Sequence, residues 1–143
     1  MRTEILLTVS ILSLLCLTGL GDVGTIEYWL TKGAEEYVNG SLKEAFRSFD
    51  NATTVDPENA TVWFARGMAL SGLKRYEEAL QSFEESIDIY PNSTQSWYGK
   101  ALALRSLGRT QEAEEAWTIY RDLSYAHISF SDNRGESMED AIV

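Results

Sequence analysis

Carboxylates are the most abundant side chains in this sequence that could do chemistry. A pair of carboxylates can act as general acid and general base when burial raises the pKa of one partner. Adjacent pairs include Glu77-Glu78, Glu84-Glu85 and Glu114-Glu115. They fall on segments whose apolar residues point elsewhere, so we expect them to face water. An exposed carboxylate has nothing to raise its pKa, and the pairs therefore indicate a solvated surface.

Groups for nucleophilic, metal-dependent or cofactor chemistry are scarce. His127 is the only histidine and Cys16 the only cysteine. No His/Cys set with metal-ligand spacing can therefore be proposed, and no nucleophile has a base to activate it. A glycine-rich loop that would cradle a phosphate is also missing. We expect no enzyme activity, no metal and no cofactor.

The charge balance narrows the class of partner. The 143 residues include 22 Asp and Glu against 12 Lys and Arg, which gives a formal net charge of −10. Such a chain repels phosphate backbones and anionic lipid headgroups, so nucleic-acid binding is not expected. Hydrophobic residues make up 44% and prolines number only two, which favours one packed, helical domain. A protein or peptide remains as the partner.

The first part of the chain, residues 1–21, differs in composition from the rest. An apolar run over residues 5–20 follows Arg2, the only basic residue of this part. A short charged start and an apolar run are typical of an export signal, and a spanning helix usually needs ~20 apolar residues. Two alternatives stay open, namely a signal peptide cleaved after Gly21 or an uncleaved membrane anchor. Either one predicts a secreted or extracytoplasmic chain, with the membrane contacted only through an uncleaved segment.

Acceptor motifs for N-glycosylation support the same location. Four of the five asparagines stand in Asn-x-Ser/Thr motifs without proline in the middle. They are Asn39, Asn51, Asn59 and Asn92. This excess predicts a glycoprotein, although asparagine and threonine at these places could also serve turns and helix caps.

The strongest pattern in the sequence is an internal period of 34 residues. Each period contains a tryptophan, a small residue, an alanine and a bulky aromatic residue, always in the same order. The four sets are Trp29, Trp63 and Trp97; Gly33, Gly67 and Ala101; Ala45, Ala79 and Ala113; and Phe49, Phe83 and Trp117. A fixed period of this length is the signature of stacked structural repeats.

Each period predicts two helices joined by a short turn. Gly40 and Gly108 can end a first helix in the left-handed conformation, and Pro57 and Pro91 cannot continue a second helix. Ser41 and the glutamate three residues later predict a capping box. The expected helices are 26–38, 41–55, 60–73, 76–90, 94–107 and 110–125. We expect the small residues to face the alanines across each hairpin, with the tryptophans in the core.

Residues 26–125 resemble the tetratricopeptide repeat family in the tryptophan, the small residue, the alanine and the following aromatic. The resemblance implies an all-α, right-handed α-solenoid of three tandem hairpins preceded by the hydrophobic N-terminal segment. The repeats would be 26–59, 60–93 and 94–125, within a domain that begins at residue 22. We expect residues 126–143 to form a polar, acidic, flexible tail.

The sequence departs from the family pattern in two ways. Basic residues replace the leucine before each small residue, and we expect their stems to cover apolar surface with their charges in water. They are Lys32, Arg66 and Lys100. Tyr120 replaces a small residue and Tyr125 a proline, which indicates that no fourth repeat packs after the third.

The resemblance also implies a binding surface, because the first helices of such repeats line a concave face. The residues it places there are Leu30, Tyr37, Phe64, Met68, Tyr98, Leu102 and Arg105. Some relatives grip a peptide's terminal carboxylate with lysine and asparagine, which are missing from these positions.

The expected function is therefore a non-catalytic scaffold or adaptor that binds a peptide or helix of a protein partner in an apolar groove. Coverage of the groove by a segment of the chain itself is an alternative. A further alternative is a structural module that forms homo-oligomers through its uncapped C-terminal end.

Overall fold

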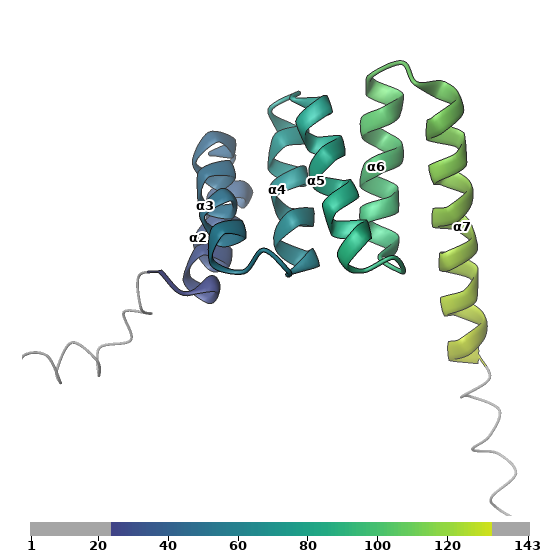
Figure 1. Cartoon of the computed structure of the whole chain (residues 1–143), viewed down its shortest axis with the longest axis horizontal. Coiled ribbons are helices and arrows are strands. Elements are labelled where there is room, and N and C mark those ends of the chain that lie inside the picture. Colours follow the sequence, from purple (N-terminus) through teal and green to yellow (C-terminus); the bar gives the residue numbers. More distant parts are fainter. Residues whose placement is uncertain (1–23, 133–143) are drawn as a thin grey trace, which may run out of the picture.

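The computed structural model describes residues 24–132, and every regular element in that range is an α-helix (Figure 1). The helices are α2 (Ile26–Val38), α3 (Leu42–Val55), α4 (Ala60–Gly72), α5 (Tyr76–Ile89), α6 (Thr94–Ser106) and α7 (Thr110–Asp132). The predicted all-α fold is confirmed. The predicted signal or anchor at residues 1–21 and the end of the predicted tail lie outside the described residues.

One boundary was wrong. The sequence predicted that the last helix ends at residue 125, but α7 continues to Asp132. No glycine or proline stands between residues 120 and 132, so nothing in the local sequence stops the helix. Residues 126–132 of the predicted tail therefore belong to α7.

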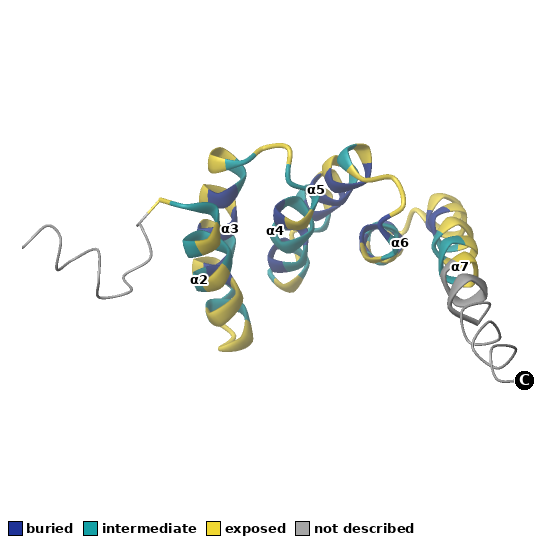
Figure 2. Cartoon of the chain, turned by 90° about the horizontal axis from the view of Figure 1, so that it is seen from below, coloured by how far each residue is buried: buried dark blue, intermediate teal, exposed yellow. Residues whose placement is uncertain are grey.

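Consecutive helices pack as hairpins, and the hairpins stack in a row. The pairs α2/α3, α4/α5 and α6/α7 form the hairpins, while α3 packs on α4 and α5 packs on α6 (Figure 1). The first helices α4 and α6 also contact each other directly. Buried positions lie where neighbouring helices face one another (Figure 2). This stacking of units that share their cores is an α-solenoid.

Aromatic rings of the second helices lie directly against glycines of the first helices. A Cβ added at Gly33 would stand 2.6 Å from the ring of Phe49, and one at Gly67 would stand 2.6 Å from the ring of Phe83. A Cβ at Gly99, on the next first helix, would also come within 2.6 Å of Phe83. Phe83 is therefore held between two repeats.

This packing corrects one expectation. The nearest neighbours of the small residues are the aromatic rings, whereas the sequence predicted the alanines. Ala45 and Ala79 are themselves fully buried and line the core beside the rings. A flat ring can lie on a backbone that has no Cβ, which explains why the rings take this place.

The repeat tryptophans are only half-buried, and two of them hold the turns between repeats. The Nε1–H of Trp63 donates to the carbonyl of Pro57 at 2.7 Å, and that of Trp97 donates to the carbonyl of Pro91 at 2.8 Å. The expectation that these rings fill the core is therefore wrong in part. The indole N–H groups bind the turns instead, and so fix where the second and third repeats begin.

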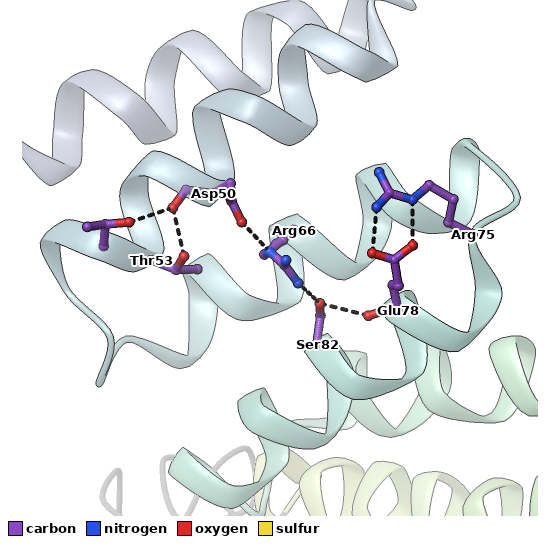
Figure 3. A network of polar contacts seen from close by, with 7 residues as sticks. Asp50, Thr53, Arg66, Arg75, Glu78 and Ser82 are labelled. Atoms are coloured by element: carbon purple, nitrogen blue, oxygen red, sulfur yellow. Dashed lines mark hydrogen bonds and ion pairs between the residues drawn. The ribbon is translucent and has the colours of Figure 1, made fainter.

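Two of the three recurring basic residues join successive repeats. Arg66 Nε lies 2.8 Å from Asp50 Oδ1, and Lys100 Nζ lies 2.8 Å from Glu84 Oε1. Arg66 also donates to Ser82 Oγ at 2.7 Å (Figure 3), and its guanidinium carbon stands 5.6 Å from the ring centre of Trp63. These charges therefore do not simply extend into water, as the sequence had suggested.

Helix caps divide the helices into two groups. Thr25, Asn59 and Ser93 accept hydrogen bonds from backbone N–H groups at the start of α2, α4 and α6. Ser41 and Arg75, which precede α3 and α5, make no such side-chain hydrogen bond. The capping box predicted at Ser41 does not form. Backbone N–H groups at the starts of α3 and α5 are left without a side-chain acceptor.

The glycine contacts predict which substitution the fold will not accept. We expect Gly99→Ala to lower the free energy of unfolding by ~1–3 kcal/mol, because overpacking at Phe83 must move a buried ring or backbone. Gly72→Ala is the matched control, since its Cβ would meet only the flexible end of Leu42 and alanine favours a helix by ~1 kcal/mol. Urea denaturation measures both. Equal stabilities for the two variants would contradict the packing described.

Candidate functional site

Two adjoining hollows run along the first helices. One holds about 380 Å³ and is lined by Phe64, Met68, Thr94, Gln95, Tyr98, Tyr120 and Ser124. The other holds about 260 Å³, and its main side chains are Tyr37, Met68, Ser71, Tyr76, Tyr98, Leu102 and Ser106. Because Met68 and Tyr98 line both, the two hollows form one surface. We call it the inner groove.

The structure brings five of the seven predicted binding residues to the inner groove. They are Tyr37, Phe64, Met68, Tyr98 and Leu102. Leu30 packs instead against the core around Ala45 and Phe49. Arg105 is exposed in the last turn of α6 and lines neither hollow.

The groove has a wall that the sequence did not predict. Tyr120 and Ser124 come from α7, the second helix of the third repeat. Tyr98, Trp117 and Tyr120 form an aromatic cluster, with ring centres 5.3 Å apart for Tyr98–Trp117 and 5.5 Å for the other two pairs. The two contacts of Trp117 are edge-to-face and the Tyr98–Tyr120 contact is tilted, and together they fix the rings relative to one another.

A signal for this wall was available in the sequence. The positions equivalent to Tyr120 in the first two repeats are Ala52 and Ser86, both buried. A large aromatic where two repeats carry a small residue cannot occupy the same place. It had to turn toward another surface, and here it turns toward the groove.

The lining sets what the groove can bind. None of the described residues that line the two hollows is charged. Aromatic and thioether side chains offer apolar contact, while Thr94, Gln95 and Ser71 offer neutral hydrogen-bonding groups. This chemistry suits an uncharged, apolar segment and gives a carboxylate no cationic partner.

Other kinds of site are not found in the described part of the chain. Among residues 24–132, no three His, Cys, Asp or Glu side chains come close enough together to hold a metal ion. Within the same range, no helix is long and apolar enough to cross a membrane.

None of the predicted glycosylation acceptors lines the inner groove. Asn39, Asn51 and Asn92 are exposed. Asn59 is half-buried, and its side chain is already engaged. Its Oδ1 accepts from the Thr61 N–H at 3.1 Å, and its Nδ2 donates to Asp56 Oδ2 at 3.2 Å. The three exposed asparagines are therefore better placed for a glycan than Asn59.

Family models for the tetratricopeptide repeat match residues 60–93 and 82–115. The matches fall on the helices, turns and aromatic contacts described above. This chain is a tetratricopeptide repeat protein. No curated protein matches it in sequence.

Solved structures with the same fold include tetratricopeptide repeat domains that bind peptides. The second such domain of Spaghetti (RPAP3), bound to the HSP90 peptide SRMEEVD, is 20% identical with a TM-score of 0.67, over 68% of this chain and 91% of that one. The TPR2B domain of yeast Sti1, in a complex with pHsp70, is 21% identical with a TM-score of 0.71, over 79% and 90%. MamA is 16% identical with a TM-score of 0.72, over 76% and 63%. Identities this low show a shared fold.

The aromatic cluster of the repeat protein predicts a spectroscopic change. We expect Tyr120→Ser, which installs the residue found at this position in the second repeat, to shift the fluorescence of Trp117 to longer wavelength. The ring loses a neighbour worth about 0.5–1.5 kcal/mol, and stability should fall by a similar amount. Ile119→Ser is the control, because Ile119 is on the same helix but exposed. Identical spectra for the two variants would show that Tyr120 does not cover Trp117.

Proposed function

We propose that this repeat protein is a non-catalytic adaptor that binds an uncharged, apolar segment of a protein partner in the inner groove. The observation that carries the proposal is the groove itself. Aromatic and apolar side chains of α4, α6 and α7 converge on it without a charged residue among those that line it. Burying apolar area contributes about 25 cal/mol per Å², so such a surface favours an apolar occupant.

Structures of the same fold support a peptide as the occupant but indicate a different chemistry. The Spaghetti domain was solved with the peptide SRMEEVD, which carries three carboxylate side chains. A groove that holds such a peptide needs cationic side chains. The inner groove offers none, so we propose a partner segment anchored by aromatic or aliphatic side chains.

The alternative of head-to-tail self-association is less well supported. Positions that pack against a preceding repeat are small in α4 and α6, such as Ala65 and Gly99. The equivalent residue in α2 is Thr31. A second copy that stacked on α2 in the same register would meet the branched side chain of Thr31. At the equivalent position between the second and third repeats, Gly99 has no side chain and a Cβ there would collide with Phe83.

The opposite end of the solenoid also carries polar residues. Leu80 and Ile87 are buried on α5, where the next repeat packs. Their equivalents on α7 are Glu114 and Arg121, and both are exposed. A polar outer face is what a terminal repeat needs to stay soluble.

We also propose that the repeats work outside the cytoplasm. The apolar run at residues 5–20 supports an export signal or anchor. The exposure of Asn39, Asn51 and Asn92 is compatible with glycans at these acceptor motifs.

The binding proposal is tested with peptides selected from a random surface-displayed library on the chain lacking residues 1–21. We expect the selected peptides to be rich in aromatic and aliphatic residues and poor in acidic ones. Phe64→Ala combined with Tyr98→Ala should weaken their binding at least tenfold, because buried aromatic anchors typically carry ~2 kcal/mol or more.

Two controls accompany this measurement. Ile119→Ala removes an apolar side chain outside the groove, and Arg105→Ala removes a nearby exposed charge. Neither should change binding by more than about twofold, since isolated exposed groups contribute little. Enrichment of acidic peptides, or full binding by the double variant, would exclude the inner groove as the proposed site.

The location is tested by fusing residues 1–25 to a reporter in the source organism. We expect the reporter to cross the membrane, and a charged substitution within the apolar run, Leu14→Arg, should keep it inside. In the full chain, treatment with an N-glycosidase should reduce the apparent mass. Joint replacement of Asn39, Asn51 and Asn92 by glutamine should abolish that reduction. A reporter that stays in the cytosol would rule out the proposed location.

A further inference from the structure

A second hollow, of about 360 Å³, shares no lining residue with the inner groove and has the opposite character. It lies between the first turns of α3 and the turn that joins α4 to α5. Its lining is Lys43, Phe46, Arg47, Leu73 and Arg75. Three of these five residues are cations and none is acidic, in a chain whose formal net charge is −10. We call this hollow the basic pocket.

Two of the three cations have no acidic partner. Arg75 is held by Glu78, with Arg75 Nε 2.6 Å from Glu78 Oε1 (Figure 3). Hydrogen bonding from Arg75 lowers the pKa of Glu78, which keeps that pair ionised. The side chains of Lys43 and Arg47 make no ion pair or hydrogen bond with any residue of the described range. They stand four residues apart on α3, so they lie on one face of the helix.

The backbone adds to the positive potential of the pocket. Lys43 is in the first turn of α3, and Arg75 immediately precedes α5. Both helices begin without a side-chain cap, and the start of a helix carries partial positive charge. The basic pocket therefore lies between two uncapped helix starts.

The next repeat shows that the fold does not need these cations. The positions equivalent to Lys43 and Arg47 are occupied by Glu77 and Gln81. The other lining positions keep their character there, as Leu80, Leu107 and Arg109. The arginine–glutamate pair is also repeated, with Arg109 Nε 2.7 Å from Glu112 Oε1. The apolar residues and the arginine–glutamate pair of the pocket therefore occur at both junctions, whereas the unpaired cations occur only at the first.

The apolar part of the pocket is preorganised by the cations around it. Phe46 packs against the cores on both sides of the junction. The guanidinium carbon of Arg75 lies 4.8 Å from its ring centre and that of Arg66 lies 5.2 Å away. These contacts hold the ring in place and leave Leu73 beside it as a second apolar contact.

We propose that the basic pocket binds an acidic segment of a protein partner in which an anionic side chain adjoins an apolar one. The anionic group pairs with Lys43 and Arg47, which are free to form charge-assisted hydrogen bonds. The apolar neighbour rests on Phe46 and Leu73. None of these residues lines the inner groove, so the site is separate from the one proposed above.

The test follows amide resonances of the ¹⁵N-labelled full chain in nuclear magnetic resonance titrations. The probe is a synthetic peptide with the sequence Gly-Glu-Phe-Glu-Gly, compared with phenyl phosphate and with inorganic phosphate. We expect the peptide to shift the resonances of residues 43–47 and 73–76 saturably. Phenyl phosphate should bind these residues more weakly, and inorganic phosphate more weakly still.

The matched variant transplants the residues of the second repeat into the first. Lys43→Glu with Arg47→Gln should weaken peptide binding by about tenfold or more, because two charge contacts are lost. Its folding is safeguarded because the same residues occupy the equivalent positions of α5. Arg105→Glu with Arg121→Gln changes the net charge equally at exposed positions elsewhere, and should weaken binding by no more than about twofold.

The reverse transplant provides a gain of function. Glu77→Lys with Gln81→Arg should create a second saturable site, seen as new shifts at residues 77–81 and 107–110. Phe64→Ala with Tyr98→Ala should leave binding at the basic pocket unchanged, which separates this proposal from the inner groove.

Several outcomes would overturn the proposal. If the two charge variants weakened peptide binding equally, binding would depend on the net charge of the protein and not on a specific site. Phenyl phosphate that binds as tightly as the peptide would indicate a small-molecule ligand and exclude a protein segment. Inorganic phosphate that binds as tightly as phenyl phosphate would show that the apolar half of the pocket takes no part.

Discussion

The structure depends on the contact between a phenylalanine ring and helix backbones without side chains. Phe83 is 1% exposed, and it lies against Gly67 of its own repeat and Gly99 of the next one. One ring therefore sets the distance between α4, α5 and α6 together. Because α4 and α6 are drawn into direct contact, their remaining side chains share one surface. The inner groove owes its continuity to this contact.

The two junctions between repeats are built from different chemistry. At the second junction, Ser93, Ser96 and Ser86 form a buried chain of hydroxyls that ends on the carbonyl of Ala60, with distances of 2.7–2.8 Å. Ser86 and Ser96 are replaced by Ala52 and Val62 at the first junction. Hydroxyl bonds depend on direction more strongly than apolar contacts do. The second junction therefore fixes the orientation of the third repeat, which carries the Tyr120 wall of the groove.

Local signals explain what could be predicted from the sequence. The turn glycines and the two prolines act within a few residues. Together with the 34-residue period of the tryptophans, they placed every helix boundary to within one residue except at the end of α7. Contacts between elements were harder to predict. Two examples are the contact of Gly33 with Phe49 and the hydrogen bond from Trp63 to the carbonyl of Pro57. Both depend on how the helices and turns pack together. Leu30 and Arg105 each fit the stripe of binding residues on their own helix, but the packing of three repeats leaves them outside the inner groove.

The basic pocket forms only where residues 43–47 lie beside residues 73–75. Those two segments are brought together by the packing of the first repeat on the second, which no local sequence signal predicts.

Comparison of equivalent positions separates scaffold from specificity. Ala45, Ala79 and Ala113 are the same in all three repeats and are buried in each, so the fold explains them. Ala34, Met68 and Leu102 are equivalent but differ in size, and only the last two line the inner groove. Its apolar surface is therefore concentrated on the second and third repeats, whereas Lys43 and Arg47 concentrate positive charge at the first junction. A scaffold that repeats three times thus presents two surfaces of unlike chemistry, because the side chains that line each surface differ between repeats.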